Sequence, residues 1–461
     1  MTHRRGAVAV IALTGLAILA VGEASAANVA TGLTEESGDV TVPTWLYLAT
    51  GGGVVGAAAL MTVLVTDRSV LSSYTGTDRR LLSRRSQWRL GAIGAIIGLA
   101  LLAFVLVVGV LGPSLGTVSA AVLVTIVGVR AVLPMVAYLV GNPWPGVDPF
   151  RRIAAVVPTL ERPYPERLAS WPAVVGVLAL VWIEIVAPVA ESAPALVALA
   201  LAYGVVTVTG AVVYTPAVWF RRADPLAVTF RLYGAVAPIQ RGDDGLELRW
   251  PGGRLGDADV VDDRSLVAVV LVLVWELTYS GFIVTEPGAE TVRTLVGLGI
   301  PPSVVYLGLL VGGLGLFWWV YWQAATLTRR RAETYLSAHY VGLRFAPPLL
   351  AIAAGYHLAH YGGFTVSLTP TVATTVTAPL SPPPNPTQFV LPGWFGYVEI
   401  AGILLGHVLA VWVAHVVSFE LFPGKLQAIR SQAPFVAIMI AFTMVSLYLV
   451  SLPASEPPYT L

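Results

Sequence analysis

Ten apolar segments, each roughly 20 residues long, recur along the chain and constrain its fold more than any other feature. A helix of about 20 residues is long enough to cross the ~30 Å hydrocarbon core of a bilayer. Only 11% of the residues are charged, against about 25% in ordinary soluble domains, and 56% are hydrophobic. We therefore expect an all-α, polytopic integral membrane bundle of about ten transmembrane helices. These are predicted at residues 43–66, 90–112, 115–140, 171–189, 195–219, 265–284, 303–326, 337–361, 393–418 and 434–453.

The N-terminus carries the pattern of a secretory signal peptide. Arg4 and Arg5 precede an apolar run at 7–21, and small residues follow at 24–27. We expect residues 1–26 to be a signal peptide that is removed, and 27–461 to form a single transmembrane domain. An uncleaved signal anchor is the alternative.

The distribution of basic residues predicts the orientation of the bundle. If the mature chain begins outside the cell, 22 Lys and Arg residues fall in cytoplasmic loops and only Arg293 falls in an outer loop. Membrane proteins concentrate basic residues in their cytoplasmic loops. We therefore expect a multi-pass protein of the plasma membrane with its mature N- and C-termini on the outer side.

Two connections are longer than the others. The cytoplasmic insert at 221–264 alternates polar and apolar residues beside glycine-rich turns, which predicts a small β-hairpin against the membrane face. The outer loop at 362–392 is rich in Thr and Pro, which predicts an extended segment that can cover an outward-facing pocket.

Composition excludes several kinds of chemistry. The chain has no Cys, so it has neither disulfides nor thiolate metal sites. A net charge of +1 and the lack of a basic, aromatic-rich patch argue against a nucleic-acid partner. The lipid bilayer and an unknown small molecule or ion remain as the expected partners. The GxxxxGK[ST] and HExxH motifs are missing, so ATP-driven transport and zincin proteolysis have no support.

Ionisable residues inside the apolar segments are the strongest functional signal in the sequence. Each costs a few kcal/mol on insertion into hydrocarbon, so a cluster of them is a functional-site hypothesis. Counting about 1.5 Å per residue from the segment ends places six of them in the outer half of the membrane. These six are Glu184, Glu276, His357, His360, Glu399 and His407. We expect Arg130, Arg344 and His415 in the inner half, where they would support the site or relay protons.

His357 and His360 are three residues apart, which places both on one face of a helix. This spacing can offer two imidazoles to one metal ion, and His407 is the expected third ligand. Without thiolates, such a site would suit zinc, iron, manganese or copper. Two alternatives are haem b held by facing histidines of the two segments, and histidines that only hydrogen-bond a neighbouring helix.

Two functional hypotheses follow from these residues. The first is a transporter or permease-like protein with an outward-facing histidine and carboxylate site that binds a metal ion or relays protons. The second is a membrane metalloenzyme in which Glu184, Glu276 or Glu399 is the general base that activates metal-bound water.

Five short stretches also occur together in this chain: 42–47 (VPTWLY), 141–144 (GNPW), 355–361 (GYHLAHY), 406–415 (GHVLAVWVAH) and 430–432 (RSQ). Taken together, they resemble a family of polytopic bacterial and archaeal membrane proteins labelled fenitrothion hydrolase-like. The resemblance implies a multi-pass fold and hydrolysis of an organophosphorothioate triester. Where the family has Asp-Gly-Phe after its sixth helix, this chain has Ser280-Gly281-Phe282 and lacks that carboxylate.

Overall fold

The computed structural model describes residues 44–76, 79–242, 244–453 and 455–459, so the predicted signal peptide lies outside the described residues. The prediction of an all-α membrane bundle is confirmed, because the described residues are mostly helical with very little strand. In these ranges, seven helices are long and apolar enough to cross a membrane. The eighth predicted segment, 337–361, is interrupted at 346–348. Ten helices, with these seven among them, correspond to the predicted segments: α2 (Thr44–Thr62), α4 (Arg84–Leu111), the continuous run of α5 (Ala120–Leu123), η3 (Val124–Val132) and α6 (Leu133–Leu139), α9 (Trp171–Val186), α10 (Ala193–Tyr214), α13 (Arg264–Ile283), α15 (Pro302–Arg331), α17 (Leu349–Thr377), α18 (Phe395–Leu421) and α19 (Lys425–Val450).

Shorter elements connect these helices. They are α3 (Arg68–Thr75), α7 (Trp144–Val147), α8 (Pro149–Val156), α11 (Pro216–Arg222), α12 (Pro225–Gly234), α14 (Glu286–Gly297), α16 (Ala338–Phe345) and the single turns η2 (Gly116–Val118), η4 (Glu166–Leu168) and η5 (Gly253–Gly256). A small antiparallel sheet has the strand order β1 (Arg79–Ser83), β3 (Gly245–Leu248), β2 (Ile239–Gly242).

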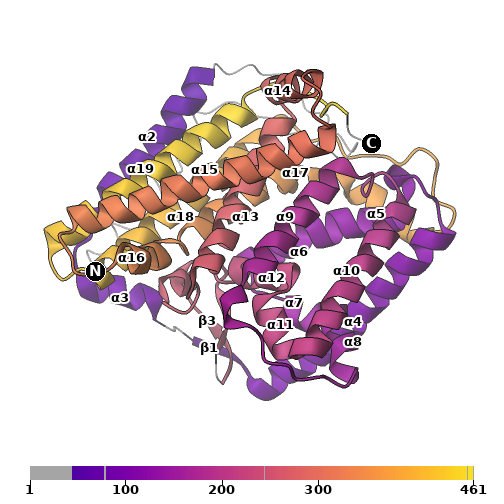
Figure 1. The fold of residues 1–461 in the computed structure, drawn as a ribbon, viewed down its shortest axis with the longest axis horizontal. Coiled ribbons are helices and arrows are strands. Elements are labelled where there is room, and N and C mark those ends of the chain that lie inside the picture. The colour runs from indigo at the N-terminus through magenta and orange to yellow at the C-terminus, as the bar shows by residue number, and fades with distance from the viewer. Residues whose placement is uncertain (1–43, 77–78, 243, 454, 460–461) are drawn as a thin grey trace.

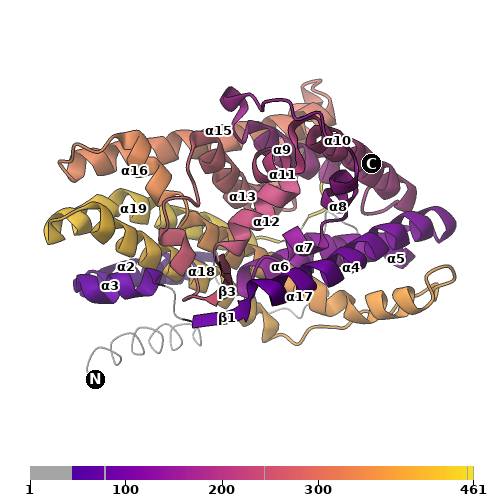
Figure 2. The same cartoon turned by 90° about the horizontal axis from the view of Figure 1, so that it is seen from below.

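The long helices form two groups with α12 and α13 between them. Helices α2, α19 and α15 lie side by side in one group, and α4 and α10 lie in the other (Figure 1). The view from below also places α12 in the middle of the molecule (Figure 2). Helix α13 is the most enclosed of the seven long apolar helices, with 78% of its apolar window buried inside the protein. The centre of the bundle is therefore protein on all sides, which is where ionisable side chains can avoid lipid.

Helices α17 and α18 pack through small residues that let their backbones touch. A Cβ atom on Gly355 would lie 2.4 Å from the carbonyl oxygen of Gly402, and one on Gly406 would lie 2.5 Å from that of Ala351. Gly402 and Gly406 form a GxxxG pattern, which brings membrane helices into close contact. The two segments that carry the predicted histidine site are therefore direct neighbours.

The prediction for the insert at 221–264 is only partly right. Strands β2 and β3 form the expected hairpin, but the residues before them form α12, which is buried inside the bundle. The local sequence carries a helix-start signal: Asp224 accepts a hydrogen bond from the Ala227 N–H, and Pro225 occupies the first helical position. The buried residues Val228, Phe230, Leu232 and Tyr233 then give the helix an apolar surface that excludes it from the aqueous face.

The prediction of an extended outer loop beginning at residue 362 is wrong for its first half. Helix α17 continues to Thr377, and an irregular segment follows it. The threonines remain helical because their hydroxyls hydrogen-bond to carbonyls one turn earlier, as Thr369 does to Thr365 at 2.9 Å and Thr375 to Thr371 at 2.9 Å. In an apolar setting this bond satisfies the threonine hydroxyl, which in water can instead bond backbone groups in non-helical conformations.

Candidate functional site: an arginine shared by two glutamates

Three charged residues from three segments form an ion-paired triad at the centre of the bundle. The Nη2 of Arg130, in η3, donates to Glu276 Oε2 of α13 at 2.9 Å, and its Nε donates to Glu184 Oε2 of α9 at 3.2 Å. The guanidinium also lies over the ring of Tyr361 of α17, 5.0 Å from its centroid. We call Arg130, Glu184 and Glu276 the triad.

The triad has an accessible side and a closed side. The side chains of Arg130 and Glu184 are 25% and 22% exposed, whereas that of Glu276 is 4% exposed. Glu184 and Arg130 are therefore partly accessible from outside the protein, and Glu276 is enclosed by it.

The backbone that carries Arg130 is not an ordinary α-helix. Segment η3 is a π-helix, in which the N–H of Leu133 donates to the carbonyl of Gly128, five residues earlier. Pro134 follows at the position whose N–H would bond the Arg130 carbonyl in an α-helix, and proline has no N–H to donate. The Nε2–H of His357 donates to this carbonyl instead, at 3.2 Å. Arg130 therefore binds α9 and α13 through its side chain and α17 through its backbone.

His357 is fixed by two neighbours and surrounded by tyrosine rings. Its Nε2 is engaged by the Arg130 carbonyl, and its Nδ1 accepts a hydrogen bond from the Tyr138 hydroxyl of α6 at 3.2 Å. These partners favour the neutral tautomer with the proton on Nε2. The rings of Tyr361, Tyr138 and Tyr233 lie 4.6, 5.7 and 5.9 Å from the imidazole.

The tyrosines are the site residues that sequence reasoning missed. Tyrosine in a membrane segment is ordinary, so neither spacing nor composition marks Tyr138, Tyr233 or Tyr361 as functional. Of the three, only Tyr361 is next to a predicted site residue in the sequence, because it follows His360 in the GYHLAHY run.

The structure distributes the other predicted residues over separate places. His360 is buried with its ring edge-on to Tyr361, at 4.8 Å. Glu399 and His407 are buried on α18, where His407 Nδ1 bonds the Ile403 carbonyl of its own helix at 2.8 Å. Of the six outer-half residues, the contacts above join Glu184 and Glu276 to Arg130 and tie His357 to the Arg130 backbone.

The residues predicted in the inner half divide in the same way. Arg130 was expected in the inner half and the two glutamates in the outer half, yet the long side chain of Arg130 contacts both. His415 bonds Gln432 at 3.2 Å and the Val65 carbonyl at 2.9 Å, so it ties α18 to its neighbours. Arg344 pairs with Glu420 at 2.7 Å, away from the triad.

The predicted metal site stays a prediction. Among the described residues, no three His, Asp or Glu side chains come together in a group that could hold a metal ion. With both ring nitrogens of His357 engaged, no lone pair of this side chain is free in this conformation for a metal or a haem iron.

An apolar groove of about 360 Å³ lies next to the site, between η3 and the C-terminal half of α17. It is lined by Val124, Val127, Gly128, Val132, Thr365, Thr369, Val372 and Ala373. None of the triad residues lines it, so the accessible side of Arg130 does not open into this groove.

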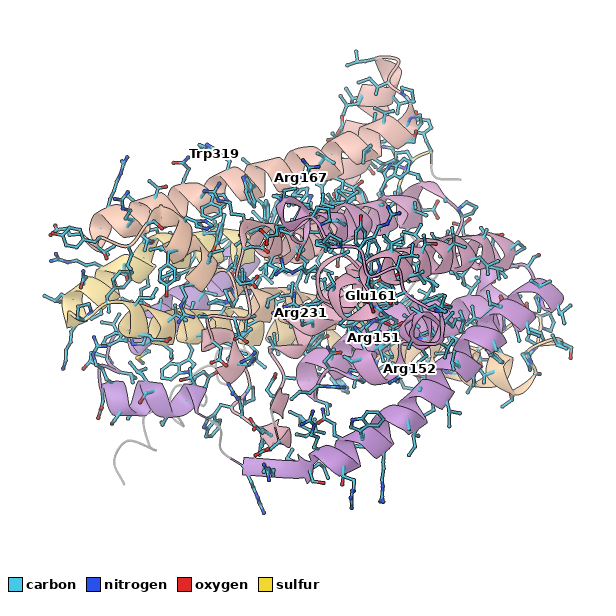
Figure 3. All side chains as sticks on the ribbon, turned by 60° about the horizontal axis from the view of Figure 1, so that its bottom comes forward. Arg151, Arg152, Glu161, Arg167, Arg231 and Trp319 are labelled. Atoms are coloured by element: carbon cyan, nitrogen blue, oxygen red, sulfur yellow. The ribbon has the colours of Figure 1, made fainter. Side chains whose placement is uncertain are left out.

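A second polar cluster, which sequence reasoning also missed, joins α8 and the start of α12 to the membrane helix α10. Asp148 is 1% exposed, and its Oδ1 accepts from the backbone N–H groups of Phe150 and Arg151 at the start of α8. Arg151 pairs with Asp148 at 3.7 Å and lies over the ring of Phe220 of α11. Figure 3 labels Arg151 close to its neighbour Arg152 on α8. Asp224, equally buried, accepts from the Tyr203 hydroxyl at 2.7 Å.

Burial and the nearby charge of Asp224 raise the pKa of Asp148 to about 7, although Arg151 and the helix N–H groups oppose the shift. An acid whose pKa is raised in the folded state is most stabilising when protonated, so stability falls as the pH rises from about 4 to about 7. Asn keeps the helix cap without the charge. We expect Asp148→Asn to unfold at a higher temperature than the wild type at about pH 8 and at the same temperature at about pH 4, where the wild-type aspartate is protonated. A destabilised Asp148→Asn at the higher pH would contradict this.

Comparisons with protein-family models, with curated proteins and with solved structures found no match to this chain. The triad geometry is therefore the basis for the functional argument.

Proposed function

We propose that this protein is a proton-coupled membrane transporter for a small molecule or ion, and that the triad is its proton site. The observation that carries the proposal is one guanidinium shared by two carboxylates from two other helices inside the bundle. With both glutamates ionised, the triad has a net charge of −1. An unbalanced charge in a low-dielectric interior is unfavourable, so the site gains stability by taking up one proton.

The position of the two carboxylates supports a direction for this proton. Glu184 is partly exposed and Glu276 is closed off, so Glu184 is the entry group and Glu276 the group that holds the proton. Chains of carboxylates and histidines are the usual proton relays of membrane pumps and transporters.

The irregular backbone at Arg130 also supports a transporter. Interrupted helices at membrane depth occur where backbone is buried in protein or lines a site, and transporters build their ion and substrate sites there. The π-helix at 124–132 followed by Pro134 is such an interruption. The loop charges support an orientation with the mature termini outside and the basic loops in the cytoplasm.

A metal-dependent hydrolase or a haem protein has less support. A metal or haem site that uses His357 would need this side chain to give up its bonds to Tyr138 and Arg130. The triad needs no such change to exchange a proton.

The test is infrared difference spectroscopy of the protein in lipid during a change of pH, which detects the carbonyl stretch of a protonated carboxylic acid. We expect one buried acid band in the wild type and its loss in Glu276→Gln. In Glu184→Gln the band should appear only at lower pH, because Arg130 then balances the charge of Glu276 alone. The matched control is Glu286→Gln, which changes an exposed glutamate paired with Arg293 and should leave the band in place. A wild-type protein without the band, or a band that persists in Glu276→Gln, would refute the proposed site.

A proton flux assay gives the functional counterpart. Vesicles that contain the wild-type protein should acidify internally when a proton gradient is applied in the presence of the transported substrate, and Glu276→Gln vesicles should not. Substrates can be screened by this signal because their identity is not needed to detect the proton.

A further inference from the structure

The hydroxyl of Tyr233 is buried at the triad and has no hydrogen-bond partner in the described residues. The residue is 2% exposed, and its oxygen is among the buried polar atoms left unpaired. An unpaired buried hydroxyl costs about 1–3 kcal/mol. The hydroxyl would therefore gain by bonding an acceptor that comes within its reach.

The surroundings of this hydroxyl offer a carboxylate partner. The Tyr233 ring lies 5.6 Å from that of Tyr138 and 5.9 Å from the imidazole of His357, which bonds the Arg130 carbonyl. Arg130 in turn holds one oxygen of Glu276, with which Tyr233 interacts electrostatically. Glu276 is the acceptor whose bonding changes when it takes up a proton, because only one of its oxygens is held by Arg130 in this state.

Helix α12 holds Tyr233 in a fixed place. The ring of Phe230 stacks on Trp144 of α7 at 4.6 Å, and the side chain of Gln240 donates to the Gly234 carbonyl at 2.8 Å. A Cβ atom on Gly234 would lie 2.6 Å from the Cβ of Asn142, so the end of the helix fits closely against the turn at 141–144. Tyr233 is thus a preorganised donor on a rigid element.

We propose that Tyr233 positions Glu276 in its protonated state, with the tyrosine O–H donating to the carboxyl oxygen once Arg130 has released it. This inference rests on the proposed proton site. When Glu276 takes up a proton, it loses the charge that holds it to Arg130, and Arg130 remains paired with Glu184. The protonated acid then turns to Tyr233. The charged and titratable groups that face Glu276 in this step are Arg130, Glu184, Tyr361 and Tyr233.

The experiment is the infrared measurement above on Tyr233→Phe, which keeps the ring and removes only the hydroxyl. A carboxylic acid that loses a hydrogen bond to its carbonyl absorbs at higher frequency, so we expect the Glu276 acid band to move up in this variant. The control is Tyr279→Phe, because Tyr279 is fully buried on the same helix as Glu276 but its hydroxyl donates to the Tyr306 carbonyl at 2.9 Å. This control should leave the band unmoved.

Thermal unfolding of both variants separates a structural role from a positioning role. Tyr233→Phe should unfold at the wild-type temperature or above, since it loses no bond in the resting state, whereas Tyr279→Phe should unfold at a lower temperature. An unmoved acid band in Tyr233→Phe would overturn the role of Tyr233 and leave the proton site standing. The absence of the band from the wild type would overturn both.

Discussion

Replacing Arg130 with glutamine should destabilise the protein by about 3–5 kcal/mol, the usual result of removing one partner from a buried ion pair. The change leaves Glu184 and Glu276 facing each other without a positive charge, and Glu276 is almost completely enclosed. The expected measurement is a large fall in the thermal unfolding temperature of the purified protein in lipid nanodiscs.

Two further variants make this prediction specific. The double variant Arg130→Gln with Glu276→Gln should recover most of the lost stability, because it removes the unpaired buried charge along with its partner. Arg293→Gln breaks an ion pair with Glu286 whose side chains are 46% and 61% exposed, and it should shift the unfolding temperature little. An equal loss in Arg293→Gln and Arg130→Gln would mean that the triad has no special place in the fold.

The second large effect is expected at the contact between α17 and α18. Gly355→Ala places a methyl group 2.4 Å from the Gly402 carbonyl oxygen and 2.9 Å from the Gly406 Cα, and neither backbone atom can rotate away. The helices must separate, which costs typically 1–3 kcal/mol and sometimes more. Because His357 is two residues further along α17, the same movement should pull its imidazole from the Arg130 carbonyl.

The control for this change lies in the same helix. At Gly362 the nearest atom to an added methyl group is Leu358 Cδ1, at 4.0 Å. There, alanine should be neutral or stabilising by up to ~1 kcal/mol, as its helix propensity predicts. Opposite shifts in unfolding temperature for Gly355→Ala and Gly362→Ala would support the packing argument, and equal shifts would contradict it.

Hydropathy predicted the helical architecture because the membrane imposes one secondary structure on every apolar segment of sufficient length. Hydropathy did not predict the helices of two less apolar stretches, the Thr-rich half of α17 and helix α12. The Thr and Pro content of the second half of α17 predicted a loop. In the structure this half is helical, and its threonine hydroxyls donate hydrogen bonds to carbonyls one turn earlier. Helix α12 lies in the insert at 221–264, whose alternating polar and apolar residues predicted a hairpin at the membrane face. In the structure this helix is buried in the bundle.

The candidate site was predictable as a set of residues but not as a set of contacts. Arg130, Glu184, Glu276 and His357 stand out because ionisable groups are rare in apolar segments. Which of them meet depends on the rotation and order of the helices, and one sequence contains neither. The histidine spacing that predicted a metal site instead places one imidazole against a backbone carbonyl that Pro134 leaves free.

That carbonyl has a mechanical consequence. The main chain of η3 is joined to α17 through the His357 bond, whereas its links to α9 and α13 run through the long, rotatable side chain of Arg130. The first coupling is stiff and the second is compliant. If the bundle changes shape as it works, α17 and η3 should travel together as one piece, and α9 with α13 should be the pair that slides against them.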